Sequence, residues 1–309
     1  MEKFLTVAQI IVPIFATLLL GAFAKRKQLL SPEHIQGLQQ LAVQFGLPCV
    51  VFNACLTASI GLESVSSMAM LLPLMFLSVL LGFQLRKKQL PYHNLPMLFA
   101  AQETGMLGIP LYMILFGADQ AYRMGILDLT QAIIAFPTIA ILTAVSGQAL
   151  KVSAIIKKVF SSPLLLMSLL GLVLNISGIA DFLENCGVLS VITQTTTFLA
   201  EPVSALMIFS VGYNFTLDKQ YRKAIFQVSG LHLALFSLFC LVFQGCLCLI
   251  PHVDVRTRWA LVLYCYLPAS FLAPGLGRGK EDAAVASGVC SLLTLVGIGV
   301  FCIIAAIAV

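Results

Sequence analysis

Long apolar stretches fill almost the whole chain, and they constrain its fold more than any other feature. An α-helix needs about 20 mostly apolar residues to cross the hydrocarbon of a bilayer. Ten stretches of this kind follow one another, at residues 5–24, 38–60, 65–84, 96–117, 124–147, 163–180, 187–212, 225–250, 257–276 and 283–308. They are too long for the strands of a β-barrel and show no alternation of period two. Helices are therefore the structure in which these stretches can satisfy all their backbone hydrogen bonds inside lipid. The sequence therefore predicts an all-α integral membrane protein with ten transmembrane helices.

The composition argues against most soluble and catalytic classes of protein. Only 10% of the residues are charged and 60% are hydrophobic, whereas a soluble domain has about 25% charged residues. No catalytic triad or phosphate-binding loop stands out, so we expect neither an enzyme nor a cofactor. The nine cysteines lie mostly inside the apolar stretches, and Cys246-x-Cys248 has no partner pair at zinc spacing. A disulfide framework and a metal site are therefore not expected.

Basic residues gather on one side of the predicted membrane. Cytoplasmic loops of membrane proteins collect Lys and Arg. Of the 18 such residues, fourteen follow the odd-numbered stretches, at positions 25–27, 86–88, 151, 157, 158, 219, 222, 223, 278 and 280. Both termini are therefore expected outside the cytoplasm, in a multi-pass protein of the cell membrane. The net charge of +5 follows from this topology and suits contact with anionic lipid, and nucleic acid is not expected as a partner.

The ten stretches divide into two halves of five, at residues 1–150 and 151–309. Because five is odd, the second half enters the membrane from the opposite side, as in the inverted repeats of many secondary transporters. Helix breakers fall in corresponding stretches. Pro48 and Pro202 lie in the second and the seventh, and Pro110 and Pro268 lie in the fourth and the ninth. We therefore expect two inverted five-helix repeats with breaks at these prolines.

The fourth and ninth stretches carry the strongest signs of interruption. The fourth reads PMLFAAQETGMLGIPLYMILFG and the ninth reads RWALVLYCYLPASFLAPGLG. Proline removes a backbone hydrogen bond, and glycine lowers helix stability by about 1 kcal/mol relative to alanine. Unwound backbone at membrane depth must line protein or water, and half-helix ends present N–H groups with a partial positive charge. Two such breaks that cross at mid-membrane would form a seat for an anion.

Four segments resemble the auxin efflux carrier family in its short bacterial form. They are FGLPCVVFNACLTAS, ETGMLGIPLYMILFG, ALMIFSVGYNF and YLPASFLAPGLGRGKEDAAVASGVCSLLTLVG. They stand in the family's order, and the resemblance runs through nearly the whole chain. The resemblance implies a scaffold of helices one, two, six and seven that forms a homodimer, and a mobile transport domain of helices three to five and eight to ten. It also implies elevator-type transport of a small organic anion such as auxin, malate or malonate. Where the family usually has asparagine, this chain has Glu103.

The candidate site consists of residues in and around the two interruptions. A carboxylate inside a membrane marks an ion or proton path, so Glu103 is the candidate for coupling to protons or sodium. The alternative is a neutral Glu103 side chain that bonds to a neighbouring carbonyl. On an intact helix, Gln102 would point about 100° away from it. The substrate-binding candidates are Gln102, Glu103, Thr104, Gly105, Gly108, Pro110, Gln131, Pro268, Ala269, Ser270, Pro274 and Asn53.

Four of the polar residues inside the stretches have roles that the sequence leaves open. Asp128 and Gln131 are three residues apart and share one helix face. The resemblance places Gln131 at the site, whereas Asp128 is expected near the headgroups. Asn53 either contacts substrate or bonds to a neighbouring helix. His232 is expected to be packed or interfacial, near the cytoplasmic start of the eighth helix.

Three functions fit these features, and a secondary carrier of a small organic anion stands first. A cation/proton exchanger of a related crossover fold is the second, although exchangers of that kind place two aspartates at the crossover. A membrane sensor without transport is the third, although the short loops leave no output domain. The stretches hold no mid-span Lys or Arg to clamp a carboxylate, so the identity of the substrate does not follow from the sequence.

Overall fold

The structure is a computed structural model, and it describes residues 2–58, 61–145, 161–250 and 252–308. All regular secondary structure within these residues is helical. The long helices and their shorter neighbours run, in order, as α1 (Glu2–Arg26), α2 (Pro32–Leu41), η1 (Ala42–Gly46), α3 (Leu47–Leu56), α4 (Leu62–Lys88), α5 (Leu95–Leu98), η2 (Thr104–Gly108), α6 (Ile109–Phe116), η3 (Ala118–Gln120), α7 (Tyr122–Val145), α9 (Pro163–Ile176), α10 (Ile179–Asn185), α11 (Val188–Ala200), α12 (Val203–Asn214), η4 (Lys219–Tyr221), α13 (Arg222–Leu247), α14 (Val255–Tyr266), η5 (Ala273–Leu276) and α15 (Lys280–Ala308).

Seven helical stretches of the described residues are long and apolar enough to cross a membrane, namely Leu5–Arg26, Pro32–Leu56, Leu62–Lys88, Ala118–Ala144, Val188–Asn214, Lys219–Leu247 and Lys280–Ala308. Two further apolar helices are shorter, at Thr104–Phe116 and Pro163–Ile176. The prediction of an all-α, multi-pass membrane protein is confirmed. The number of ten spans stays a prediction, because the fourth and ninth stretches are interrupted and the sixth is short.

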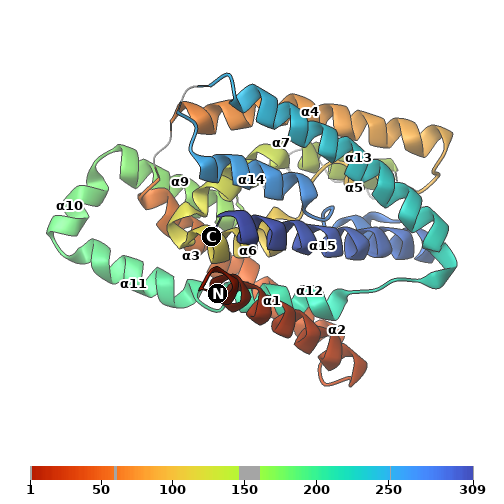
Figure 1. Ribbon diagram of the computed structural model, residues 1–309, viewed down its shortest axis with the longest axis horizontal. Coiled ribbons are helices and arrows are strands. Elements are labelled where there is room, and N and C mark those ends of the chain that lie inside the picture. The colour runs from red at the N-terminus through yellow and green to blue at the C-terminus, as the bar shows by residue number, and fades with distance from the viewer. Residues whose placement is uncertain (1, 59–60, 146–160, 251, 309) are drawn as a thin grey trace.

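The helices form two groups that lie side by side (Figure 1). In one group, which lies along the bottom and the left of that view, α1 packs against α12, and α3 packs against α9 and α11. In the upper group, α4 packs against α7, while α13 packs against α14 and α15. Helix α12 also contacts η2 and α6, so the backbone around residue 104 lies where the two groups meet.

Two glycines let α1 and α12 approach very closely. A Cβ atom added at Gly21 would lie 2.1 Å from the carbonyl oxygen of Phe209, and one added at Gly212 would lie 2.1 Å from that of Leu18. Apolar burial drives little helix association inside lipid, so small residues that allow close backbone packing take over that role. The α1–α12 pair is thus held by backbone-to-backbone fit.

The proline of the second stretch does not break its helix, so the break expected at Pro48 is wrong. Residues Pro32–Leu56 stay helical throughout, with the π-helical turn η1 directly before α3. A π turn absorbs one extra residue, which leaves the backbone able to continue past a proline. At the corresponding Pro202, α11 ends at Ala200 and α12 begins at Val203, with only a short turn between them.

The basic ends of several helices lie at one end of the molecule. Lys25 and Arg26 end α1, residues 86–88 end α4, and Lys280 begins α15. In Figure 1 these helix ends, with the start of α13, lie toward the right, away from both chain termini. The predicted basic loop with Lys151, Lys157 and Lys158, and the predicted boundary between the halves at residue 150, lie outside the described residues.

Candidate functional site

Two non-helical segments from the fourth and ninth stretches pair with each other in the interior. Gln102 and Ala269 form an isolated antiparallel bridge. The N–H of Glu103 donates to the carbonyl of Pro268 at 2.8 Å, and the N–H of Ser270 donates to that of Ala101 at 3.0 Å. We call residues 99–103 and 267–271 the paired segments. Their backbone groups satisfy each other, as they must inside a membrane.

Local sequence explains why helix is lost at these points. Leu267 has φ −63° and ψ 153°, the extended conformation that a following proline favours. Gly108 lies against Leu267, because a Cβ atom there would come within 2.6 Å of the Leu267 side chain. Pro110 directly follows the π-helical turn η2, and the helix Thr104–Phe116 continues past it. The break expected at Pro110 is therefore wrong, and the fourth stretch loses helix just before Thr104 instead. Pro274 falls within the first turn of η5, where proline's missing N–H costs nothing.

Gln131 of α7 binds the backbone of the first paired segment as a strand would. Its Oε1 accepts from the N–H of Gln102 at 2.8 Å, and its Nε2 donates to the carbonyl of the same residue at 2.9 Å. The same Nε2 also lies 2.7 Å from Oγ1 of Thr104 and 2.9 Å from Oδ1 of Asp128. The resemblance placed Gln131 at the site, and the structure brings it to these residues.

Asp128 lies in the same cluster, whereas the sequence favoured a place near the headgroups. The hydroxyl of Thr104 donates to Oδ1 of Asp128, which also accepts from Gln131. Asp128 is partly exposed, while Thr104 is fully buried and Gln131 is 4% exposed. Spacing on α7 explains the grouping of Asp128 with Gln131, but the contact with Thr104 needs the tertiary fold.

Glu103 holds backbone N–H groups of both interrupted stretches. Its Oε2 accepts from the N–H of Phe271 at 2.7 Å, and its Oε1 accepts from the N–H of Met106 at 3.3 Å. The side chain is buried, with 9% exposed. The anion-binding position that we expected at the two interruptions is therefore occupied by a carboxylate of the chain itself.

Two residues near the site, Tyr264 and Cys290, were missed from the sequence, and His232 takes the packed one of the two roles expected for it. Tyr264 of α14 is fully buried, and its hydroxyl donates to Oε1 of Gln131 at 2.8 Å. His232 of α13 is also fully buried and stacks on Phe236, with ring centroids 4.4 Å apart, so it is packed and not interfacial. Cys290 of α15 places its Sγ 3.4 Å from the carbonyl of Ala269. The depth of a residue in the membrane and its spacing along a helix do not predict which residues of the apolar helices face the interrupted segments.

Gln102 links the paired segments to His232. With its amide nitrogen toward the ninth stretch, Gln102 donates to the carbonyls of Leu267 and Pro268, each at 3.1 Å. Its amide oxygen then faces Nε2 of His232 at 3.3 Å. Nδ1 of that histidine has no hydrogen-bond partner within the described residues.

Asn53 bonds to the neighbouring helix α11. Its Nδ2 donates to Oγ1 of Thr197 at 3.2 Å, and its Oδ1 accepts from the hydroxyl of Thr196 at 2.6 Å. These contacts match the interhelical alternative. Gly105 is closer to the interruption, and it faces Leu47 of α3 across the boundary of the two helix groups.

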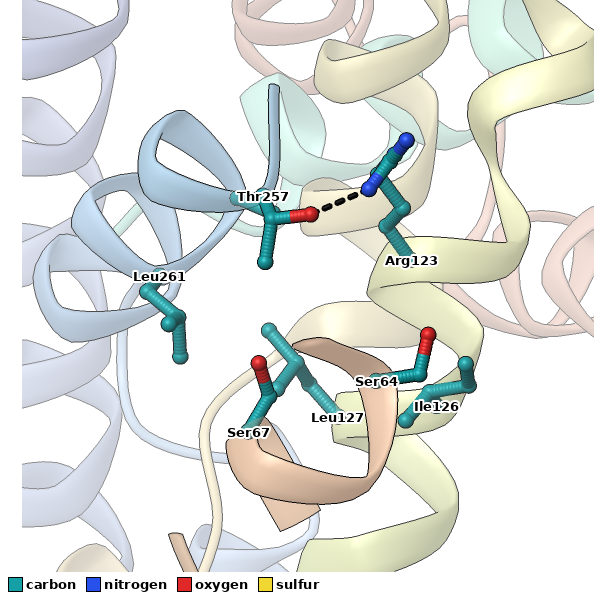
Figure 2. A pocket seen from close by; sticks show the side chains of 8 residues that line it. Ser64, Ser67, Arg123, Ile126, Leu127, Thr257 and Leu261 are labelled. Carbon is teal, nitrogen blue, oxygen red and sulfur yellow. Dashed lines mark hydrogen bonds between the residues drawn. The ribbon is translucent and has the colours of Figure 1, made fainter. Parts of the chain in front are cut away.

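A buried arginine joins three helices at the end of the molecule opposite the basic helix ends. Arg123 of α7 lies 2.7 Å from Glu63 of α4 and 2.7 Å from Asp254, the N-cap of α14. It also donates to Thr257. Figure 2 shows this bond at the edge of a small pocket, which is lined by Ser64, Ser67, Arg123, Ile126, Leu127, Thr257, Ala260 and Leu261. The carboxylates of Glu63 and Asp254 both form ion pairs with the guanidinium of Arg123, so it is not free to bind an external anion.

Replacing Tyr264 by phenylalanine should lower the free energy of unfolding by about 1 kcal/mol, because one buried hydrogen bond to Gln131 is lost while the ring remains. The quantity can be measured by denaturant unfolding in mild detergent. Tyr266→Phe, two positions along α14 and about 200° around it, is the control and should change stability less. Equal losses in both variants would contradict a specific role for the Tyr264 hydroxyl.

The arrangement defines a class of protein: a helical membrane protein with two interrupted stretches paired in its interior and a buried polar cluster around them. No group of three metal-ligating side chains occurs among the described residues, and the cluster consists of amides, hydroxyls and carboxylates. Such a site suits the binding of a small solute inside the membrane.

Comparison with known families identifies the chain more closely. The family described as membrane transport protein matches residues 6–272. The chain therefore belongs to the membrane transport protein family, which is the family of the auxin efflux carriers. The resemblance seen in the sequence is thereby confirmed. A search of curated proteins returned no match.

Proposed function

We propose that this membrane transporter is a secondary carrier that moves a small organic anion, such as a carboxylate, across the cell membrane. The observation that carries the proposal is the contact of one carboxylate with backbone N–H groups from both interrupted stretches. That carboxylate belongs to Glu103, but its contacts are chemically those that a substrate carboxylate would make. Amide, hydroxyl and backbone groups around it supply polar contacts without a fixed cation.

The paired segments are the crossover of this carrier, and the two helix groups are its mobile transport domain and its scaffold. Helices α4, α7, α13, α14 and α15 carry the site, and the group with α1, α3, α9 and α12 is the scaffold that forms a homodimer. Elevator-type transport would slide the first group against the second. The contacts of η2 with α12 and of Gly105 with Leu47 lie at that sliding boundary.

Packing of the helices supports two inverted repeats. If the first and second stretches correspond to the sixth and seventh, the α1–α12 contact corresponds to the α9–α3 contact. In the same way, α4 against α7 corresponds to α13 against α15. The basic helix ends then face the cytoplasm, and both termini lie outside it.

Uptake by proteoliposomes is the test of the proposed function. We expect the protein to take up at least one of a panel of labelled mono- and dicarboxylates, assayed with and without a pH gradient. Gln131→Leu should abolish uptake, because it leaves the N–H of Gln102 without a partner, whereas Glu201→Gln should retain uptake, because Glu201 is exposed. Failure of every carboxylate would contradict an anion carrier.

A cation/proton exchanger remains the second candidate, and the placement of Asp128 favours it. Asp128 brings a second carboxylate to the cluster that contains Glu103, through Thr104. In the same vesicles, an exchanger would release internal protons when external sodium is added, without any carboxylate. This outcome, combined with no carboxylate uptake, would select the exchanger.

A further inference from the structure

Glu103 is an acidic side chain buried without a basic partner. No Lys or Arg of the described residues lies within ion-pair distance of its carboxylate. The titratable groups that surround it are Asp128 on α7, Cys290 on α15, Tyr264 on α14 and, beyond Gln102, His232 on α13. An isolated buried charge is costly unless it is neutralised or hydrogen-bonded, so the charge on Glu103 depends on the two N–H groups that it holds.

The donors around the two carboxylates favour a proton over a metal cation. Cations such as sodium or calcium need several oxygen atoms with free lone pairs that converge on one point. Here both oxygens of Glu103 already face N–H donors, and Oδ1 of Asp128 faces the hydroxyl of Thr104 and the amide of Gln131. These donors would repel a cation, whereas a proton can attach to a single oxygen.

The two contacts of Glu103 differ in length, which indicates where the proton attaches. The bond from Phe271 to Oε2 is 2.7 Å, and the bond from Met106 to Oε1 is 3.3 Å. A protonated oxygen is a weaker acceptor than an ionised one, so the proton goes to the oxygen with the weaker contact. Protonation of Oε1 then releases the N–H of Met106, at the start of the apolar helix Thr104–Phe116.

We propose that Glu103 and the carboxylate of the transported anion compete for the backbone N–H of Met106, so that one proton binds Glu103 for each anion that binds the site. This inference rests on the proposed carrier function and adds its coupling. The proton comes from the solution on the side to which the site is open. A monocarboxylate and its proton would therefore cross together without net charge, and the anion must leave before Glu103 can ionise and return to its contacts.

The proton on Glu103 can be tested without any substrate. Infrared difference spectra between acidic and alkaline pH, taken on the reconstituted protein, should contain a band from the C=O of a protonated carboxylic acid. Glu103→Gln should remove that band, and the matched variant Glu201→Gln should retain it. A band that survives in Glu103→Gln and disappears in Asp128→Asn would assign the proton to Asp128 and overturn the proposal.

Competition is tested by binding of acetate and malonate to the purified protein at several pH values. In the wild-type protein, affinity should fall by about tenfold for each unit of pH above the ionisation of Glu103, with uptake of one proton for each acetate bound. In Glu103→Gln the affinity should not change with pH and no proton should be taken up, because the neutral amide leaves one N–H free at every pH. Proton uptake that is unchanged in this variant would overturn the inference.

The two proposals can fail separately. If neither probe binds and no other carboxylate is transported, the anion-carrier function is wrong, and the infrared band still decides whether Glu103 holds a proton. If carboxylates bind with the same affinity at every pH in the wild-type protein, the carrier stands and the competition is wrong. Thermal unfolding in detergent confirms that Glu103→Gln is folded, so that loss of binding is not mistaken for loss of the protein.

Discussion

Replacing Arg123 by leucine should lower the free energy of unfolding by about 3 kcal/mol, because it leaves acidic groups without their cation in a partly buried place. The arginine side chain is 8% exposed, that of Glu63 is 16% exposed and that of Asp254 is 32% exposed. Because Asp254 keeps contact with water, solvent screens its charge, and Asp254 should contribute less than Glu63 to the loss of stability. Most of the effect should come from Glu63, which also accepts from the N–H of Asp254 at 2.9 Å.

Thermal unfolding followed by a thiol-reactive dye is a suitable measurement, since several cysteines are buried in the folded protein. Arg256→Leu is the matched control, because this arginine is exposed at the start of the same helix α14. The control should unfold close to the wild-type temperature. Were Arg123→Leu as stable as this control, the three-helix ion pair would contribute nothing to the fold.

Gly212→Leu should prevent α1 and α12 from packing, with a cost of about 3 kcal/mol or more. A side chain at this position would meet the carbonyl oxygen, carbonyl carbon and Cα of Leu18 within 2.8 Å. Backbone atoms cannot rotate away as a flexible side chain would, so the two helices must separate. Separation would open the scaffold group and reduce the yield of folded protein.

The yield of monodisperse protein in size-exclusion chromatography, with the unfolding temperature, measures this effect. Gly230→Leu is the control, because a Cβ atom there would meet nothing within 4 Å and the residue is likewise inside a long apolar helix, α13. Near-normal yield is expected for the control. Near-normal yield for Gly212→Leu would mean that the close approach of α1 and α12 is not required.

Local chemistry accounts for the parts of the fold that were predicted. Hydrophobicity alone indicates membrane helices, because lipid admits few other structures. Proline with neighbouring glycines indicated interruptions of the fourth and ninth stretches, and both stretches contain a non-helical segment, at residues 101–103 and 267–270. The same reasoning failed at Pro48 and Pro110, where a π turn precedes the proline and the helix continues. A proline therefore marks a place where helix is costly, while the surrounding packing decides whether the chain unwinds there.

The candidate site was only partly predictable for a similar reason. Glu103 and Gln131 stand out because polar groups are rare inside apolar stretches. Tyr264, His232 and Asp128 act through contacts between helices that are far apart in the chain, such as the 133 positions between Gln131 and Tyr264. No spacing within one helix reveals such a contact.

Membrane insertion, helical class, family membership and the presence of two interrupted stretches follow from the order of residues, because hydrophobicity and backbone preference act over a few neighbours. The tertiary structure decided which groups meet at the interruptions. It placed the carboxylate of Glu103 on the N–H groups of Met106 and Phe271, where an external anion had been expected. That outcome depends on the ninth stretch lying against the fourth, because a side chain can occupy backbone donors of a distant segment only after packing has brought the two together.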